Sequence, residues 1–511
     1  MLRFKRKTMK LFFNLLVLIS LLHSSDYEDW LKQQNSSYNN YKKSMDEEFT
    51  SMLKEQWKSY KTYLKDGTYS KPKPKAMPKT IEKEITKKEI QESKKVSIQP
   101  IIKKEKTVIE IKKIPKKLPK IVIPKDIVVK KVQEEKEQKK EKDEPVVQTT
   151  MTTIKFDFYN SPIALNIPNK LINYTNNKAS KENIAKFWDF MANSSYKDVV
   201  EQIEFYTQTL QFNDWAKYVF IYKLGQNIYH NNNLANLFTW FILVKDGYDM
   251  RVAYNENIYL LAYVNHSLYQ ISYFNLNKKK YYTLSINGRI GNIGQIYTYK
   301  GNYPNANKPL NLYIKNNLHL KEDFAKRELS FKYDNKNYKI DSMYNKNLVN
   351  FYANYPQVDF KIYFKEAYSS NEFSDMLSQL KDIIQGKSEL EAVNMLLRFT
   401  QTAFSYQTDP EQFKREKPLF PSETINYPYS DCEDRSIFFA FLVKELIGLK
   451  VVAVKFPDHL ATAVEFSTNI SGDAFKFKGK RYVIADPTYI NANVGMRMPK
   501  YKSSKFEVIQ Y

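Results

Sequence analysis

A long Lys/Pro-rich stretch divides the chain into parts that must fold independently of it. Residues 71–150 contain 24 Lys and eight Pro, but no Gly and no aromatic residue. This composition supplies too little apolar surface to offset the entropy of ordering, and the prolines interrupt any long helix. We therefore predict a disordered, extended Lys/Pro-rich linker over residues 68–150. We interpret it as a spacer, with a binding role as the less favoured alternative.

The linker also carries much of the positive charge of the chain. Its 24 Lys face 13 acidic residues, whereas the whole chain of 511 residues has a net charge of +24. A nucleic-acid-binding protein would place such charge on a folded face with interleaved aromatic residues. We therefore predict no nucleic-acid partner.

The N-terminus has the pattern of an export signal. Basic residues precede an apolar run from Leu11 to Leu22, which is interrupted by Asn14 and is too short to span a bilayer comfortably. We interpret residues 1–25 as a cleaved signal peptide, with an uncleaved membrane anchor as the alternative. Either reading predicts an exported protein, in the periplasm or associated with the cell envelope.

An amphipathic helix is predicted over residues 26–67. Apolar residues recur there at steps of three and four, and Gly67 would end the helix; they are Met45, Phe49, Met52, Leu53, Trp57, Tyr60 and Leu64. The helix would pack on its own domain or form a coiled coil with another chain. A membrane-surface helix is less favoured because acidic residues 46–48 lie within it.

The pattern of apolar residues in the middle of the chain predicts an α+β fold. Over residues 151–295 we expect helices at 181–194, 197–211, 214–230 and 234–245, followed by strands at 250–254, 259–264, 268–274 and 280–285. Over residues 296–370 alternation predicts a small β-sandwich, with one strand at 358–364. The histidines of these regions, His230, His266 and His319, lack clustered ligands and are not expected to bind metal.

Cys432 is the only cysteine. It lies in Asp-Cys-Glu-Asp-Arg-Ser (431–436), at the start of a helix whose apolar residues continue to Leu446 and which Gly448 ends. A helix start favours thiolate over thiol, although Glu433 and Asp434 would oppose this. The charged flanks predict a position at the protein surface and a nucleophilic role. A buried structural cysteine is the alternative.

A base and its orienting group follow Cys432 along the chain. His459, the only histidine in the last 140 residues, lies between predicted strands at 450–456 and 460–466. A third strand, 481–485, leads into Asp486. A nucleophilic thiol requires such a base, and the base requires an orienting group.

These residues resemble the transglutaminase-like core, a papain-like fold shared by transglutaminases and related bacterial cysteine peptidases. The resemblance covers roughly residues 388–490, within an expected catalytic domain at 371–511. It implies that Cys432 attacks a carboxamide or peptide carbonyl, that His459 moves the proton and that Asp486 holds the imidazole. It implies a protein or peptide substrate. We also expect a cell-envelope or cell-wall partner and predict neither cofactor nor metal. A non-catalytic envelope module that binds through the same cleft is the alternative function.

A second, degenerate copy of this core is a further hypothesis. Residues 234–245 followed by Gly247 align with residues 436–444 followed by Gly448, and strand 280–285 aligns with the strand that starts near Lys480. The position of Cys432 would then hold Asn233 or a neighbour, and that of His459 about Tyr259. Chance similarity between two α+β segments is the alternative.

Overall fold

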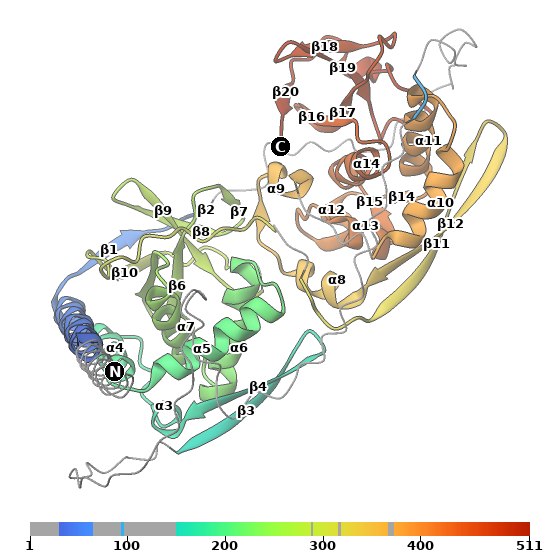
Figure 1. The fold of residues 1–511 in the computed structure, drawn as a ribbon. Coiled ribbons are helices and arrows are strands. Elements are labelled where there is room, and N and C mark those ends of the chain that lie inside the picture. The colour runs from blue at the N-terminus through green and yellow to red at the C-terminus, as the bar shows by residue number, and fades with distance from the viewer. Residues whose placement is uncertain (1–29, 65–93, 97–149, 288–289, 315–317, 366–371) are drawn as a thin grey trace, which may run out of the picture.

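The structure, a computed structural model, is of mixed α+β class, as predicted, and describes residues 30–64, 94–96, 150–287, 290–314, 318–365 and 372–511 (Figure 1). The expected signal peptide and nearly all of the expected linker lie outside these residues. None of the described helices combines the length and the apolarity that crossing a bilayer requires.

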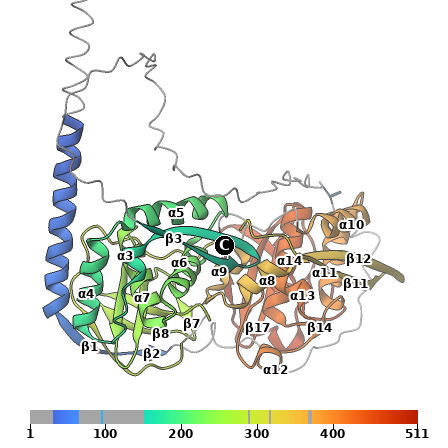
Figure 2. The same ribbon diagram turned by 90° about the horizontal axis from the view of Figure 1, so that it is seen from below.

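The N-terminal helix covers residues 30–55, and Figure 2 shows it along one side of the molecule. Its buried residues Met45, Phe49 and Leu53 pack into the core, as the periodicity predicts. The predicted continuation to residue 67 is wrong, because β1 (Trp57–Lys61) and β2 (Tyr63–Leu64) follow the helix. Trp57 pairs with Tyr299 of a sheet that is distant in sequence, and this long-range pairing overrides the local helical spacing.

A first unit follows from residue 151. It begins with the hairpin of β3 (Met151–Phe158) and β4 (Ser161–Pro168). Its helices are α3 (Asn169–Ile172), α4 (Lys181–Ala192), α5 (Tyr196–Thr209), α6 (Asp214–Tyr229) and α7 (Asn232–Lys245). Its later strands are β5 (Met250–Tyr254), β6 (Ile258–Tyr263), β7 (Leu268–Tyr269), β8 (Ser272–Leu276), β9 (Lys279–Leu284) and β10 (Gln295–Tyr299). All of these strands except β7 join β1 and β2 in an antiparallel sheet of order β1-β10-β5-β6-β9-β8-β2. The four predicted helices of this region are confirmed.

A second unit begins with a long hairpin, β11 (Phe324–Tyr333) and β12 (Lys336–Asn345). Short elements follow: α8 (Lys346–Ala353), β13 (Gln357–Val358), α9 (Phe360–Lys365), α10 (Ser374–Ile384) and α11 (Glu389–Thr402). Next come β14 (Ser405–Tyr406), α12 (Asp409–Phe413), α13 (Pro421–Asn426), β15 (Tyr429–Ser430) and α14 (Cys432–Leu446). The chain ends with β16 (Lys450–Phe456), β17 (His459–Glu465), β18 (Ala474–Phe477), β19 (Lys480–Ala485), η1 (Pro499–Tyr501) and β20 (Glu507–Ile509).

The predicted β-sandwich over residues 296–370 is wrong. In the described part of this range, β10 joins the first sheet, and the β11–β12 hairpin packs on α10 and α11 of the second unit. The strand predicted at 358–364 is the short β13 followed by helix α9, which packs on α14. The buried residues Phe360, Tyr363 and Phe364 have helical spacing, which competes with the alternation that suggested a strand.

The same arrangement of elements occurs twice. The strand order β10-β5-β6-β9-β8 of the first unit is repeated as β20-β16-β17-β19-β18 in the second. In the first unit the opening hairpin packs on α6, α6 packs on α7, and α7 covers the central strands β5 and β6. In the second unit the opening hairpin packs on α11, α11 packs on α14, and α14 covers the central strands β16 and β17. One difference between the units lies in the connection of these two helices: residues 230–231 join α6 to α7, whereas residues 403–431 lie between α11 and α14.

The two units share contacts across one continuous core. Strand β13 of the second unit pairs with β7 of the first, and the Tyr269 hydroxyl donates to Asp359 Oδ1 at 2.9 Å. The described chain therefore forms one body with two similar halves (Figure 1).

Candidate active site

Helix α14 begins at Cys432, as predicted. Asp431 is the N-cap residue, and its backbone N–H donates to Asp434 Oδ2 at 3.0 Å, which completes a capping box. At the other end, Gly448 has a φ of +76° and its N–H donates to the Val443 carbonyl at 3.1 Å. The cap and the stop that the sequence contains thus fix both ends of the helix.

The predicted surface position of Cys432 is wrong. Cys432 is 0% exposed, and the neighbouring charged residues Glu433 and Asp434 are buried with it. The segment 403–431 covers this end of the helix; for example, the Leu419 N–H donates to Asp434 Oδ1 at 2.8 Å. The charged residues around Cys432 are therefore enclosed by the protein interior, where the sequence suggested solvent, and two of their oxygens, Asp431 Oδ1 and Glu433 Oε1, are buried without a hydrogen-bond partner among the described residues.

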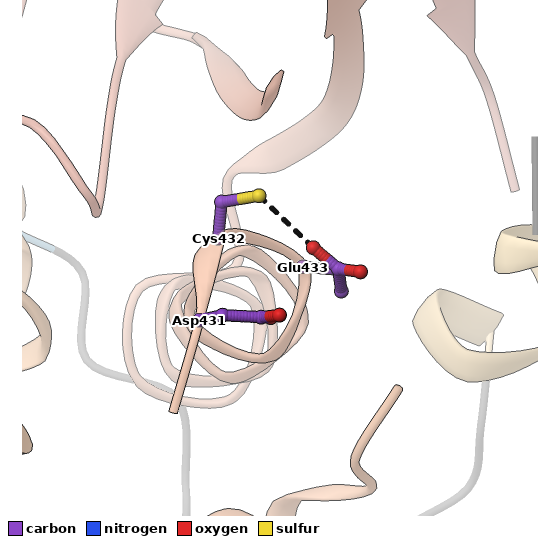
Figure 3. Close-up of side chains that lie close together, drawn as sticks. All are labelled: Asp431, Cys432 and Glu433. Carbon is purple, nitrogen blue, oxygen red and sulfur yellow. Dashed lines mark hydrogen bonds between the residues drawn. The ribbon is translucent and has the colours of Figure 1, made fainter. Parts of the chain in front are cut away.

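The thiol interacts with an adjacent carboxylate. Cys432 Sγ donates to Glu433 Oε2 at 2.9 Å (Figure 3). Burial raises the pKa of the Cys432 thiol well above its usual value, and the negative charges of Glu433 and Asp431 raise it further. A hydrogen bond from the Leu460 backbone lowers the pKa but does not compensate. This environment therefore favours the thiol over the thiolate that the helix start was expected to stabilise.

His459 and Asp486 form the predicted pair. His459 is the first residue of β17, and its Nε2 lies 2.8 Å from Asp486 Oδ2. Asp486 follows β19, and its other oxygen accepts the N–H groups of Thr488 at 3.0 Å and Tyr489 at 3.2 Å. Both members of the pair are buried. The carboxylate is thus held from both sides and fixes the plane and the tautomer of the imidazole.

The packing of α14 on β17 brings the cysteine to the histidine end of the strand. Ser436 Oγ donates to the Leu460 carbonyl at 3.1 Å, and the Leu460 backbone also bonds to the sulfur. Leu460 is adjacent to His459 in the chain. The Nδ1 atom of His459 is buried and has no hydrogen-bond partner among the described residues. The sulfur therefore lies beside the backbone of the residue that follows His459, and the thiol proton is directed to Glu433.

An aromatic residue that the sequence did not single out covers the imidazole. The Tyr501 ring lies parallel to the His459 ring, with centroids 5.3 Å apart and planes at 10°. Phe456 stacks on Tyr501 at 4.8 Å, and an ion pair between Lys500 and Asp458 holds the same segment. Tyrosine is so frequent in this chain that no sequence pattern distinguishes Tyr501. Of the two tyrosines that shortly precede Cys432 in the chain, Tyr427 packs on Phe413 and Tyr429 is 38% exposed.

A buried acidic cluster surrounds the start of α14. Its acidic residues, Asp409, Glu416, Asp431, Glu433 and Asp434, form overlapping groups of three, and within each group the ligand atoms lie within 4.8 Å of one another. Carboxylate oxygens are the ligands that Ca²⁺ and Mg²⁺ prefer, so these donors could hold a cation. Burial and the neighbouring carboxylates also raise the pKa of Asp434 well above its usual value. Sequence reasoning missed the cluster because three of its members, Asp409, Glu416 and Asp431, come from the segment 403–431.

The equivalent site of the first unit lacks these side chains. Asn233 Oδ1 accepts the Ile258 N–H at 2.9 Å, and Asn236 Nδ2 donates to the Ile258 carbonyl at 2.8 Å, as Ser436 does to Leu460. By this correspondence Asn257 occupies the position of His459, two residues before the expected Tyr259. Ser285 follows β9 as Asp486 follows β19.

Comparisons of the chain with protein-family models, with curated proteins and with solved structures found no match. The chemistry of the site must therefore be argued from its own residues.

Proposed function

We propose that the second unit is a transglutaminase-like thiol enzyme that acts on protein or peptide amide bonds through Cys432, His459 and Asp486. The observation that supports this most directly is the His459–Asp486 pair at 2.8 Å. The pair occupies Nε2 and leaves Nδ1 as the ring nitrogen that can accept a proton from the thiol. We also propose that this unit has a papain-like core and that the first unit is a degenerate copy of it.

The proposed reaction follows from these groups. His459 Nδ1 takes the thiol proton, and the sulfur bonds to the carbonyl carbon of the amide. The C–N bond then breaks, the leaving amine takes the proton from the imidazolium, and a thioester remains on Cys432. Water releases a carboxylic acid from this thioester, whereas an amine releases a new amide. Peptidase, amidase and crosslinking activity share this intermediate, and the acyl acceptor decides among them.

The buried thiol implies a closed resting site. Glu433 competes with His459 for the thiol proton, because Cys432 Sγ donates to Glu433 at 2.9 Å. Substrate entry would have to move the covering segments, which include 403–431 and 499–501. The Coulomb repulsion between the thiolate and Glu433 then opposes activation until the carboxylate moves or is protonated.

Export is part of the proposal and rests on the N-terminal sequence. Basic residues followed by the apolar run 11–22 favour a signal peptide or an N-terminal membrane anchor. A protein or peptide substrate in the cell envelope fits that location.

A non-catalytic binding module is the second candidate. It is favoured by the complete burial of Cys432 and by the first unit, where asparagine and serine replace the three reactive residues. In that case the cleft would bind peptide or cell-wall polymer without forming a thioester.

The two candidates differ in thiol reactivity and in turnover. The rate of Cys432 labelling by iodoacetamide, followed by mass spectrometry, should fall in His459→Ala if the imidazole accepts the thiol proton. The exposed His319 provides a matched control, since His319→Ala should label like the wild type. Incorporation of a fluorescent amine into a glutamine-containing protein and hydrolysis of peptides should both be lost in Cys432→Ala. Equal, slow labelling of the wild type and His459→Ala, with no turnover, would favour the binding module.

A further inference from the structure

In the first unit, one extended segment pairs with both edges of the sheet. Strand β1 pairs antiparallel with β10, and β2, which follows β1 after one residue, pairs antiparallel with β8. The Tyr60 ring also packs on that of Phe274 in β8, with centroids 5.1 Å apart. Residues 57–64 therefore fill the gap between β8 and β10 and leave neither strand with an unpaired edge.

The second unit has the same two edges, but no strand of the described residues pairs with them. Strands β18 and β20 correspond to β8 and β10, and each is the last strand at its end of the sheet. The two edges face each other, since the Phe475 and Phe506 ring centroids lie 5.0 Å apart. Lys478 Nζ donates to Gln510 Oε1 at 2.6 Å, so β18 and β20 run in the same direction. One added strand could therefore be antiparallel to both, as residues 57–64 are in the first unit.

The outer edge of β18 presents the backbone groups that β2 uses on β8. A two-residue turn follows Phe477 of β18, as one follows Leu276 of β8, and this fixes the alternation of hydrogen bonds along each strand. Three residues earlier, Ala474 and Tyr273 therefore point their N–H and C=O groups away from the hairpin partner. Tyr273 pairs with Tyr63 of β2. Ala474 is thus the position on β18 at which an added strand would bond.

Val508 is the corresponding position on β20. It pairs with Val454 of β16, as Thr298 of β10 pairs with Ala253 of β5. The two pairs match, because each lies one residue from the strand pair that α14 or α7 contacts. Thr298 pairs on its other side with Lys58 of β1. An added strand would occupy the same side of Val508.

The charge around the two edges indicates which kind of strand fits. Residues 474–511 contain eight basic and two acidic residues. The acidic side chains in or beside this region are already engaged: Glu507 with Lys455, Asp458 with Lys500, Glu465 with Lys450 and Lys480, Asp486 with His459, and Asp473 with the Arg497 N–H. Four exposed lysines form no ion pair within the described residues; they are Lys476, Lys478, Lys502 and Lys505. The edges therefore carry a surplus of positive charge that suits an acidic strand.

We propose that the gap between β18 and β20 binds an extended acidic segment of a partner polypeptide, which adds to the sheet as a strand. Backbone hydrogen bonds would provide the affinity, as they do when a peptide adds to a sheet edge, and the four lysines would select acidic side chains. The added strand would replace the contact between Lys478 and Gln510. The Lys/Pro-rich stretch of this chain suits the gap less well, because its own net charge is positive. This inference does not depend on the chemistry at Cys432.

Fluorescence anisotropy with labelled eight-residue peptides and the full chain tests the proposal. The glutamate peptide has the sequence of residues 57–64 with both lysines replaced by glutamate, and the lysine peptide has the unchanged sequence. The proline peptide is the glutamate peptide with proline at the position of Tyr60, which removes a backbone N–H that a strand requires. We expect saturable binding of the glutamate peptide, and binding of each of the other two at least about tenfold weaker.

Variants locate the site. Val508→Pro should weaken binding of the glutamate peptide at least about tenfold, because it removes an N–H that faces the gap and leaves the pairing with β16 intact. Lys476→Glu should weaken it about tenfold as well, whereas Lys326→Glu, an exposed control on β11, should leave it unchanged. Thermal unfolding of each variant verifies that it folds, and Lys476→Glu alone decides the question if Val508→Pro does not fold.

Three results would overturn the proposal. The first is that the glutamate peptide does not bind. The second is that the lysine or the proline peptide binds as tightly as the glutamate peptide. The third is that Lys476→Glu and Lys326→Glu bind the glutamate peptide equally well.

Discussion

Replacing Glu433 by Gln should make Cys432 more reactive. The carboxylate accepts the thiol hydrogen bond at 2.9 Å, and at this distance a thiolate and a carboxylate repel by about 6 kcal/mol at an effective dielectric constant near 20. Measured shifts caused by one adjacent charge are smaller, about 1–3 pKa units. In Glu433→Gln the pKa of the thiol should therefore fall, although Asp431 remains and keeps part of the increase.

The expected change in rate follows from two opposing effects. At neutral pH the thiolate fraction should rise about tenfold for each unit by which the thiol pKa falls. A less basic thiolate is also a weaker nucleophile, and this removes roughly half of the gain on a logarithmic scale. Labelling by iodoacetamide should therefore accelerate about three- to tenfold at pH 7. The absence of any other cysteine lets intact-mass spectrometry follow the reaction at one site.

The pH dependence of labelling separates this cause from a general loosening of the site. The midpoint of the rate profile should move to lower pH in Glu433→Gln. It should not move in Glu445→Gln, a control near the other end of α14 whose side chain is 38% exposed. An unchanged midpoint, or one displaced to higher pH, would refute the argument that Glu433 holds the thiol protonated.

Three further changes test other parts of the fold and site. Asp486→Asn should abolish turnover and cost about 1–3 kcal/mol of unfolding free energy, measured by urea denaturation, because the carboxylate accepts hydrogen bonds on both oxygens. Burial raises the pKa of Glu372 to about 7, so the stability that its protonated form provides is fully present below about pH 4.5 and is lost as pH rises through 7. Glu372→Gln should remove this loss, so between pH 5 and pH 8 its unfolding free energy in urea denaturation should rise by about 2–3 kcal/mol relative to that of the wild type. If the unfolding free energies of the two proteins change in parallel with pH, this prediction is wrong. Gly472→Ala should lose about 2–5 kcal/mol in the same assay, because its φ is +112° and a Cβ would lie 2.5 Å from Gly495 Cα. Gly479→Ala, whose Cβ would meet no atom within 4 Å at a φ of +76°, should lose only about 1–2 kcal/mol.

The sequence predicted the parts of the site that depend on local pattern. Helix α14 begins at Cys432 and ends before Gly448, because capping and apolar spacing act within one segment. Helix α11 is capped in the same local way, since Ser388 accepts the Glu391 N–H at 3.2 Å. The order of Cys432, His459 and Asp486 on a helix and two strands is also as predicted.

Features that depend on distant segments could not be predicted in this way. The burial of Cys432 requires the segment 403–431 to fold over a flank that is charged in sequence. Strand β1 was mistaken for helix because its pairing partner, β10, lies more than two hundred residues away. The alternation of apolar and polar residues suggests a β-sandwich, but a long hairpin packed on helices of the same unit has the same alternation.

Backbone contacts at the ends and in the middle of the Lys/Pro-rich stretch argue against its interpretation as a spacer. Leu64 ends in the first sheet, Val96 and Lys94 form backbone hydrogen bonds with Lys387 and Glu389 of the second unit, and residue 150 leads back into β3 of the first. The stretch therefore leaves and returns to the same folded body, and it cannot separate the N-terminal helix from the rest as a spacer would. A protease that cuts it once would yield two fragments that co-elute under native conditions and separate only in denaturant.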